Sequence, residues 1–512
     1  MAMSRREFVQ RSGMAALYSF SSRESFAADS ASCQKLRTDP LRPQYHLLPA
    51  RNWMNDPNGP IYFGDRYHMF HQYNPRGATW GNMHWAHATS PDMVHWQHQG
   101  IALAPTAGGP DSDGVFSGSA VLHEGEVAVI YTGVAPPSSD GEATLRDGAH
   151  TWRETQCIAV AQDPDLKTWK KDPEPIIKAP PAGLEVTGFR DPALWREGNE
   201  WMLILGSGVR GKGGTILLYS SIDLRHWTYL HPLVEGTAAK TTGVNPVDTG
   251  DMWECPDFFS IGDKHVLLIS TMGKVRWKVG TYANRQFSPE KEGVVDWGSY
   301  YAAKTMLDAH GRRILWGWIP ETRPDADLIA AGWAGAMSLP RVVSLTSQNE
   351  LKTEVAPVVD KIVGDRLVHL DDIEVGPTGH PALDSVRIKD IAAEIQMEVQ
   401  PKAEEFALRL YSDSGDFVSI SISSKFGRHE LGVNKLAAPL SGTPGSPLRL
   451  HIFLDGSVLE IFANESVALT ARNYQIPDGV LRVKTLGKAR LKSVQIREMK
   501  PISKDRLADD CT

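Results

Sequence analysis

The sequence predicts an all-β protein, with a five-bladed β-propeller followed by a C-terminal β-sandwich. Two repeats and one change of texture support this fold. A hairpin pattern occurs five times, a short phrase ending in tryptophan occurs three times, and tryptophan is absent after Trp333 while short alternating segments continue. Repetition at a regular spacing is the sequence signature of repeat architectures such as propellers.

Each copy of the hairpin pattern has a short apolar strand, a turn rich in glycine and charge, and a stronger apolar strand. The spacing of roughly 50 to 75 residues suits four-stranded blades. A β-sandwich would also contain hairpins, but it would not explain their periodic recurrence. The five copies are residues 60–70, 119–131, 193–205, 258–269 and 302–316.

The second repeat consists of an aspartate, an apolar residue, two variable residues and a tryptophan. Its aspartates are Asp92, Asp165 and Asp223. The phrase indicates a strand that ends in a turn. We therefore expect its tryptophans to pack within the blades rather than to bind a ligand; they are Trp96, Trp169 and Trp227.

The change of texture suggests the domain boundaries. The propeller is expected over residues 40–345, a linker over 346–364, and the sandwich over 365–498. Residues 499–512 are a charged tail that is expected to fray.

At the N-terminus, Arg5 and Arg6 are followed by Phe8, which is the pattern of a twin-arginine export signal. Residues 1–28 are therefore expected to direct export to the periplasm or beyond.

Composition excludes several classes of partner. The chain has 512 residues and a formal net charge of -7, so it offers no general attraction for nucleic acid. No apolar run approaches the roughly 18 residues of a membrane span.

The four cysteines have neither the spacing of a zinc site nor that of a dense disulfide framework. We expect no metal and no cofactor, and the oligomeric state is not readable.

A chemically distinctive phrase stands before each hairpin. In a propeller, the innermost strands all start at the same end of the central channel, so these five phrases should surround one funnel. Three of them contain a carboxylate: Asp56, Asp191 and Glu254. A single carboxylate at a strand end is usually a turn or cap residue. Three at equivalent positions favour a site that cleaves glycosidic bonds, which needs one carboxylate at the anomeric carbon and one acid at the leaving oxygen.

Longer motifs support this chemistry. His46-x-x-Pro49, followed by Met54-Asn55-Asp56-Pro57-Asn58-Gly59, resembles the signature of glycoside hydrolase family 32, which contains invertases, fructan hydrolases and fructosyltransferases. Other segments resemble family motifs in the same order, and the resemblance covers about residues 45–496. They include Phe116-Ser117-Gly118-Ser119, Phe189-Arg190-Asp191-Pro192, Trp253-Glu254-Cys255-Pro256-Asp257-Phe258, and the stretch from Asp455 to Asn464 in the C-terminal unit.

The resemblance implies a role for each carboxylate. Asp56 would be the nucleophile that attacks C2 of a β-fructofuranosyl unit, and Glu254 would be the acid/base. Asp191 would stabilise the transition state. The reaction would retain configuration, with the carboxyl groups of Asp56 and Glu254 about 5 to 5.5 Å apart. Apolar Trp253 and the neighbouring carboxylates are expected to favour the acid form of Glu254.

The same comparison suggests which residues hold the fructosyl unit. Hydroxyl hydrogen bonds and an aromatic wall would come from Asn55, Gln72, Trp80, Phe116 and Ser117. Arg190 would lie beside Asp191. Trp80 fits equally well as a propeller core residue. The expected function is hydrolysis of terminal β-D-fructofuranosyl units.

Three questions stay open at this level. The substrate can be sucrose, levan or inulin, and terminal attack is favoured if the funnel is a closed pocket. A fructosyltransferase on the same scaffold would pass the fructosyl unit to a sugar hydroxyl instead of water, a choice made by loops outside the motifs. A noncatalytic fructan-binding protein is a third reading, but such a protein would be expected to have lost one of the three carboxylates.

Overall fold

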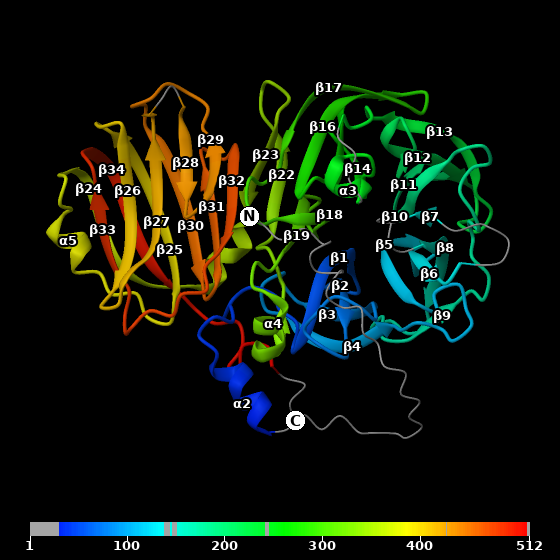
Figure 1. The fold of residues 1–512 in the computed structure, drawn as a ribbon, viewed down its shortest axis with the longest axis horizontal. Helices are drawn as coiled ribbons and strands as arrows, with labels where there is room; N and C mark the ends of the chain where they lie inside the picture. Colours follow the sequence, from blue (N-terminus) through cyan, green and yellow to red (C-terminus); the bar gives the residue numbers. More distant parts are fainter. Residues whose placement is uncertain (1–29, 138–143, 146–150, 241–244, 426–427, 509–512) are drawn as a thin grey trace.

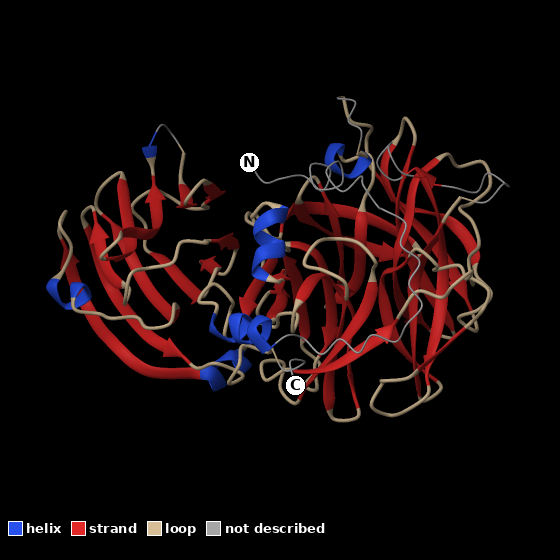
Figure 2. Ribbon diagram, turned by 60° about the horizontal axis from the view of Figure 1, so that its bottom comes forward, coloured by secondary structure: helices blue, strands red, loops and turns tan. Residues whose placement is uncertain are grey.

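The computed structural model describes residues 30–137, 144–145, 151–240, 245–425 and 428–508. Within these residues the chain forms two all-β units, a propeller and a sandwich, that lie side by side (Figure 1). Strands make up most of both units, and the few helices lie at the edges of the sheets (Figure 2). No helix in these ranges is long and apolar enough to cross a membrane. The expected export signal, residues 1–28, lies outside the described residues.

Five sheets in the described part of the chain form the propeller, which confirms the predicted fold class. The first strand of each blade contacts the first strand of the next, in the order β1, β5, β10, β14, β18 and back to β1. The ring is also tied by the chain that leaves the last blade. There, β20 (Trp333–Ala334) pairs in parallel with β1, while β21 (Ala336–Met337) pairs with β19 of the fifth blade.

The strands of the five blades follow one another along the chain. They are β1 (Asn52–Phe63), β2 (Arg66–Asn74), β3 (His84–Ser90) and β4 (Gln97–Leu103); β5 (Gly114–His123), β6 (Glu126–Ala135), β7 (Thr144–Leu145), β8 (Thr151–Ala161) and β9 (Trp169–Lys171); β10 (Val186–Glu197), β11 (Glu200–Val209), β12 (Gly213–Ser221) and β13 (Thr228–Glu235); β14 (Glu254–Ile261), β15 (Lys264–Thr271), β16 (Lys274–Ala283) and β17 (Gln286–Val294); β18 (Tyr301–Leu307), β19 (Arg313–Ile319), β22 (Arg341–Leu345) and β23 (Leu351–Val355).

The sandwich packs two sheets, of six and five strands in the described residues, over one apolar core. The first has the order β24, β34, β25, β30, β31, β32, and the second has the order β29, β28, β27, β26, β33. The bounds are β24 (Val363–Val375), β25 (Ala392–Pro401), β26 (Glu405–Ser412), β27 (Gly415–Ser423), β28 (Glu430–Val433), β29 (Leu436–Pro439), β30 (Leu448–Asp455), β31 (Val458–Ala463), β32 (Val467–Arg472), β33 (Arg482–Leu486) and β34 (Ala489–Met499).

Short helices connect or flank these sheets. They are α2 (Ser30–Thr38), α3 (Pro246–Thr249), α4 (Asp325–Ala331), the 3-10 helix η1 (Pro357–Ile362) and α5 (Pro381–Asp384).

The sequence pattern of the strands differs between the two units because their sheets are buried differently. Middle strands of the blades pack against neighbouring blades on both faces, so a strand such as β12 is buried along its whole length. Several strands of the sandwich bury one face only, so β33 and the second half of β27 alternate between buried and partly exposed residues, whereas β31 and β32 are buried throughout. This difference explains the change in sequence pattern near residue 345.

The repeated phrase forms the same kind of turn in its three copies. The apolar residue after the aspartate is buried and takes a positive φ at Met93, Leu166 and Leu224 (71°, 57° and 62°). The indole N–H groups of Trp169 and Trp227 donate to the carbonyls of Leu166 and Leu224, both at 3.0 Å. These tryptophans and Trp96 pack in separate blade clusters, which confirms their predicted structural role.

Two segments are more ordered than the sequence suggested. β23 lies within residues 346–364, the expected linker, and pairs with β22 as an outer strand of the fifth blade. The tail does not fray up to residue 508. Leu507 and Ala508 are buried, and Ala508 packs against Trp333. Two apolar residues among many charges gave no periodic signal, so the sequence did not reveal this packing.

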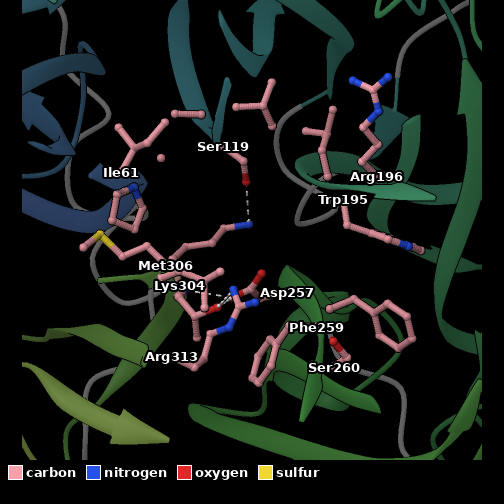
Figure 3. A pocket seen from close by; sticks show the side chains of 18 of the residues that line it. Ile61, Ser119, Trp195, Arg196, Asp257, Phe259, Ser260, Lys304, Met306 and Arg313 are labelled. Atoms are coloured by element: carbon pink, nitrogen blue, oxygen red, sulfur yellow. Dashed lines mark hydrogen bonds between the residues drawn. The ribbon is translucent and has the colours of Figure 1, made fainter. Parts of the chain in front are cut away.

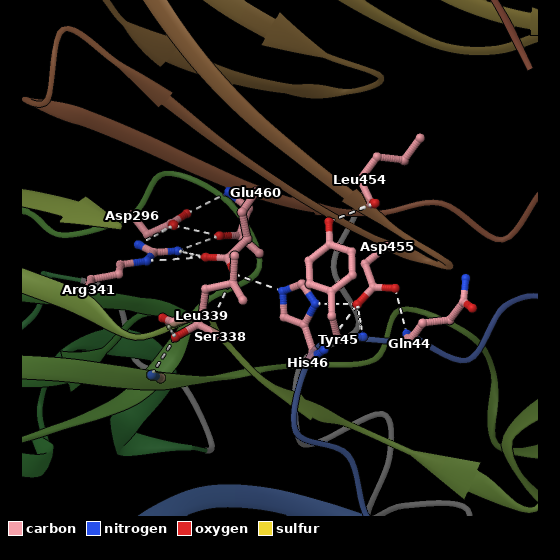
Figure 4. Close-up of polar contacts among 12 residues, drawn as sticks. Gln44, Tyr45, His46, Asp296, Ser338, Leu339, Arg341, Leu454, Asp455 and Glu460 are labelled. Atoms are coloured by element: carbon pink, nitrogen blue, oxygen red, sulfur yellow. Dashed lines mark hydrogen bonds and ion pairs between the residues drawn. The ribbon is translucent and has the colours of Figure 1, made fainter. Parts of the chain in front are cut away.

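A network of buried charges joins the two units (Figure 4). His46, from the first family motif, contacts Asp455 Oδ2 through Nδ1 at 2.7 Å and Glu460 Oε1 through Nε2 at 2.9 Å. Arg341, from the fifth blade, pairs with Glu460 and, at 2.9 Å, with Asp296. All five side chains are fully buried. The Asp455–Asn464 stretch therefore supplies part of the sandwich side of the interface, together with Thr470 and Arg472 of β32.

The charge state of His46 follows from its two partners. Burial lowers the pKa of His46, but its hydrogen bonds to Asp455 and Glu460 outweigh burial and raise this pKa to about 9. Glu460 lies beside Arg341 and His46, which outweigh its burial and lower its pKa to about 2. His46 is therefore an imidazolium ion at neutral pH, with both ring nitrogens donating.

This network predicts a pH-dependent stability. Because the pKa of His46 rises from 6.5 to about 9 on folding, its contribution is complete below pH 6.5 and lost as pH rises to about 9. The loss should be on the order of 3 kcal/mol. Urea unfolding across this pH range measures it. In His46→Gln, which cannot titrate, the unfolding free energy should be lower at pH 6.5 and should fall much less with pH. Equal pH slopes for the two proteins would contradict the assignment.

Candidate active site

A β-bulge interrupts the inner strand of every blade. In each bulge, two residues of the inner strand lie opposite one residue of its partner, which bends the strand and re-aims its side chains. The same two-to-one irregularity recurs in β1, β5, β10, β14 and β18. The bulged pairs are Asn55–Asp56, Phe116–Ser117, Asp191–Pro192, Cys255–Pro256 and Ala302–Ala303.

Local sequence accounts for several of these bulges. Proline lacks the N–H that a central strand must donate, so it is tolerated where the ladder is already broken. Pro192 and Pro256 occupy such positions. The residues before them, Asp191 and Cys255, take positive φ values of 64° and 47°, as does Ala302 at 54°. A positive φ is unfavourable for these residue types, and such strain is often found at functional sites.

Asp56 is held by a network of polar side chains. Its Oδ1 accepts a hydrogen bond from Asn55 Nδ2 at 3.0 Å, and its Oδ2 accepts one from Ser117 Oγ at 2.6 Å. Gln72 links the two donors, because its Oε1 accepts from Asn55 and its Nε2 donates to Ser117, both at 3.0 Å. Trp53 Nε1 donates to Asn55 Oδ1 at 2.7 Å and so fixes the orientation of that amide.

Glu254 is held by a buried arginine and a tyrosine. Arg190 donates to Glu254 Oε1 through Nε and Nη2, at 3.2 and 2.7 Å, and its Nη1 donates to Glu154 Oε1 at 3.0 Å. The hydroxyl of Tyr301 donates to Glu254 Oε2 at 2.9 Å. Burial lowers the pKa of Arg190, but the carboxylates of Glu154, Glu254 and Asp191 raise it above its usual range. Arg190 is therefore a permanent cation.

Asp191 is close enough to the other two carboxylates to feel their charge. Its Oδ2 accepts hydrogen bonds from the backbone N–H of Cys255 at 2.9 Å and from the thiol of Cys255 at 3.4 Å. Burial raises the pKa of Asp191, Arg190 opposes this, and the charges of Glu254 and Asp56 raise it further, to about 6. Arg190 therefore limits a shift that burial and the neighbouring carboxylates cause.

Cys255 connects two of the carboxylates. Its thiol also lies 3.5 Å from Asp56 Oδ2, so one sulfur is within hydrogen-bonding distance of both Asp56 and Asp191. Burial raises the pKa of Cys255 well above its usual value, and the three carboxylates raise it further. The thiol is therefore protonated and serves as a weak donor rather than as a nucleophile.

The structure brings the predicted site residues together, but the side chains of Arg190 and Trp253 point elsewhere than expected. Arg190 is turned toward Glu254 and Glu154, as a partner of the carboxylates. The indole of Trp253 faces the third blade, where a Cβ atom on Gly214 would lie 2.3 Å from its ring, so Trp253 packs away from the carboxylates. The aromatic pair Trp80 and Phe116 is in edge contact, with ring centroids 6.0 Å apart.

Sequence reasoning missed three partners of these residues. They are Tyr301, Glu154, and Thr132, whose Oγ1 accepts from the backbone N–H of Asp191 at 2.9 Å. Tyr301 stands at the fifth funnel position, so its repeat phase was the available signal. Glu154 and Thr132 lie on the neighbouring strands β8 and β6, where no repeat marks them. No group of His, Cys, Asp and Glu that could hold a metal ion occurs among the described residues.

Comparison with known proteins identifies the family. The glycosyl hydrolases family 32 N-terminal domain matches residues 46–355, and the family 32 C-terminal domain matches residues 372–498. The chain is 34% identical over 487 residues to a sucrose-6-phosphate hydrolase of Escherichia coli, covering 88% of this chain and 92% of that protein. It is 33% identical over 466 residues to a raffinose invertase of the same species, covering 85% and 90%.

A solved structure agrees with these matches. A variant of fructan 1-exohydrolase IIa from Cichorium intybus, in complex with 1-kestose, superposes with a TM-score of 0.77 at 26% identity, covering 90% of this chain and 98% of that one. Both domain models, the full-length relatives and the propeller-plus-sandwich fold therefore agree, and the chain belongs to glycosyl hydrolases family 32 as one of its enzymes.

Proposed function

We propose that this protein is a retaining β-fructofuranosidase that removes terminal β-D-fructofuranosyl units from sucrose or fructans. The observation that carries the proposal is the meeting of three buried carboxylates, Asp56, Asp191 and Glu254, at the bulges of three different blades. Two carboxyl groups complete a retaining hydrolysis, and a third can hold the sugar.

In this mechanism Asp56 attacks C2 of the fructosyl unit while Glu254 donates a proton to the leaving oxygen. The products of the first step are a fructosyl ester on Asp56 and a free alcohol. Glu254 then removes a proton from water, which attacks C2 and releases fructose and the Asp56 carboxylate. This requires the carboxyl groups of Asp56 and Glu254 to be about 5 to 5.5 Å apart.

The hydrogen bonds around the carboxylates hold each one in place. Asn55 and Ser117 donate to Asp56 and fix its orientation. Tyr301 and Arg190 fix the orientation of Glu254. Asp191 would accept hydrogen bonds from the fructosyl hydroxyls, alongside those from Cys255.

The fructosyl unit would rest against the polar network around Asp56. Asn55, Gln72 and Ser117 have further hydrogen-bonding capacity for sugar hydroxyls, while Phe116 and Trp80 would form an apolar wall. Arg190 would act on the substrate only through Glu254, because its guanidinium is bound to two carboxylates.

A neutral fructoside suits this site better than a phosphorylated one. Glu154 adds a fourth buried carboxylate to the three others, and Arg190 is bound to Glu154 and Glu254. A substrate phosphate near this cluster would meet repulsion. Sucrose, levan and inulin are therefore the favoured substrates, although one full-length relative is named a sucrose-6-phosphate hydrolase.

We also propose export for the chain. The Arg5-Arg6 pattern motivates this, and Cys33, which is buried and disulfide-bonded, supports it because structural disulfides persist in oxidising compartments.

The catalytic roles predict distinct outcomes for two variants. Asp56→Gly and Glu254→Ala should each lower fructose release by about 1,000-fold or more while remaining folded. With an activated fructoside and azide, Asp56→Gly should yield an α-fructosyl azide, because azide attacks from the face that Asp56 used. Glu254→Ala should yield the β-azide, formed from the covalent intermediate. Asp223→Ala, which removes an exposed turn carboxylate, is the control and should retain turnover within about twofold. Near wild-type turnover in either catalytic variant would contradict the mechanism.

The substrate proposal is tested by product analysis. The protein, incubated separately with sucrose, inulin, levan and sucrose 6-phosphate, should release free fructose from one or more of the three neutral fructosides and should act more slowly on the phosphate ester. Chromatography of the products from sucrose alone separates hydrolysis from transfer, because a fructosyltransferase accumulates longer oligosaccharides. Absence of any fructosyl cleavage would refute the proposed function.

A further inference from the structure

A buried lysine lies on the inner strand of the fifth blade, three residues after Tyr301. Lys304 is only 2% exposed, and within the described residues it forms no ion pair. Its ammonium group donates to the carbonyl oxygen of Pro256 at 2.8 Å and to Ser119 Oγ at 3.4 Å. Burial of a cation without a bound anion costs free energy, so we expect Lys304 to have a specific role at this position.

The partners of Lys304 belong to the bulges that carry the carboxylates. Pro256 is the second bulged residue of β14, directly after Cys255, while Pro192 is the second bulged residue of β10, directly after Asp191. Ser119 Oγ donates to the carbonyl oxygen of Pro192 at 2.8 Å. Lys304 and Ser119 therefore form one continuous chain of hydrogen bonds that joins β18, β14, β5 and β10.

These hydrogen bonds supply donors for backbone carbonyl groups that the bulges leave without a partner in the ladder. A bulge disrupts the ladder locally, and a buried carbonyl without a donor costs about 1 to 3 kcal/mol. Lys304 supplies the donor for Pro256, and Ser119 supplies the donor for Pro192. If these bonds were lost, the two strand segments that position Asp191 and Glu254 would be free to shift relative to each other.

Lys304 and Ser119 also line a cavity at the opposite end of the inner strands (Figure 3). This cavity has a volume of about 700 Å³ and is lined by the C-terminal parts of these strands, including Tyr62, Leu122 and Leu307. In Figure 3 the Lys304 side chain extends across the cavity toward Ser119. The hydrogen-bonded pair thus lies between the cavity and the bulges that carry the carboxylates.

Charged groups also lie around Lys304 on the cavity side. Asp257 accepts a hydrogen bond from the backbone N–H of Thr305, and Arg313 lines the same cavity. Toward the active site, Lys304 lowers the pKa of Cys255, but burial and the three carboxylates outweigh it and raise this pKa.

We propose that Lys304 is a positioning residue for catalysis: with Ser119 it fixes the spacing of the bulges that carry Asp191 and adjoin Glu254. This inference rests on the proposed function, since it concerns the geometry of the same carboxylates. Lys304 itself does not touch the reacting atoms.

The test uses two substitutions. Lys304→Met removes the hydrogen bonds to Pro256 and Ser119, whereas Lys304→Gln keeps a donor for Pro256. Kinetics are measured on the best substrate of the wild-type protein. In Lys304→Met, kcat should fall by about 100-fold with KM changed by less than about threefold, because misplaced catalytic groups affect turnover more than ground-state binding. Lys304→Gln should recover part of kcat.

The split between kcat and KM, with recovery by the conservative variant, is the readout that a merely structural role would not move. Ser119→Ala removes the donor for the Pro192 carbonyl and should likewise lower kcat with little change in KM. Lys274→Met is the matched control, because Lys274 likewise donates to uncharged oxygens, the backbone carbonyls of Trp297 and Gly298, in another blade. It should retain kcat within about twofold.

The possible results are distinguishable. An unchanged kcat in Lys304→Met, or a loss of thermal stability without a change in kcat, would overturn the proposal while leaving the proposed function intact. If Lys304→Met does not fold, Lys304→Gln and Ser119→Ala decide the question. If the wild-type protein cleaves no fructoside, the proposed function fails and this inference fails with it.

Discussion

The repeated bulge at one level of the inner strands is the constraint on which the active site depends. In an inner strand without a bulge, successive side chains would point to opposite faces of the sheet along the whole strand, including the positions of the carboxylates. In each bulge, two residues lie opposite one partner residue, and this one extra residue re-aims the side chains. Asp56, Ser117 and Asp191 therefore project from bulges, and Glu254 directly precedes one. The propeller ring then brings the five bulges together, although the chain between Asp56 and Glu254 passes through most of the domain.

Buried charge follows one pattern at the site and at the domain interface. Arg190 bridges Glu154 and Glu254, Arg341 bridges Asp296 and Glu460, and His46 bridges Asp455 and Glu460. Each cation therefore has two carboxylates, which offsets desolvation only when geometry and hydrogen bonding are nearly complete. Lys304 departs from this pattern, since its bonds go to a carbonyl and a hydroxyl.

Repeat phase and family motifs together predicted the fold class and the residues of the site, because both depend on short-range patterns. The phrases around Asp56, Asp191 and Glu254 carry proline at or beside bulges, so local sequence already marked the broken ladder. The partners of these residues were harder to predict. Thr132 and Glu154 lie on the second and third strands of a blade and contact Asp191 and Arg190. Arg190 donates to Glu254 because of how it is packed in the fold, which its position in the sequence does not indicate. Burial of Leu507 likewise depends on contacts with residues far away in the chain.

In the proposed mechanism, the bulges place Asp56 where it attacks the fructosyl carbon, while Glu254 protonates the leaving group. Mass spectrometry of Glu254→Gln after incubation with an activated fructoside, followed by proteolysis, tests this directly. We expect a protein adduct with the mass of one anhydrofructosyl unit to accumulate on the peptide that contains Asp56. An adduct on another carboxylate, or turnover without any adduct together with inversion of configuration in methanolysis products, would contradict it.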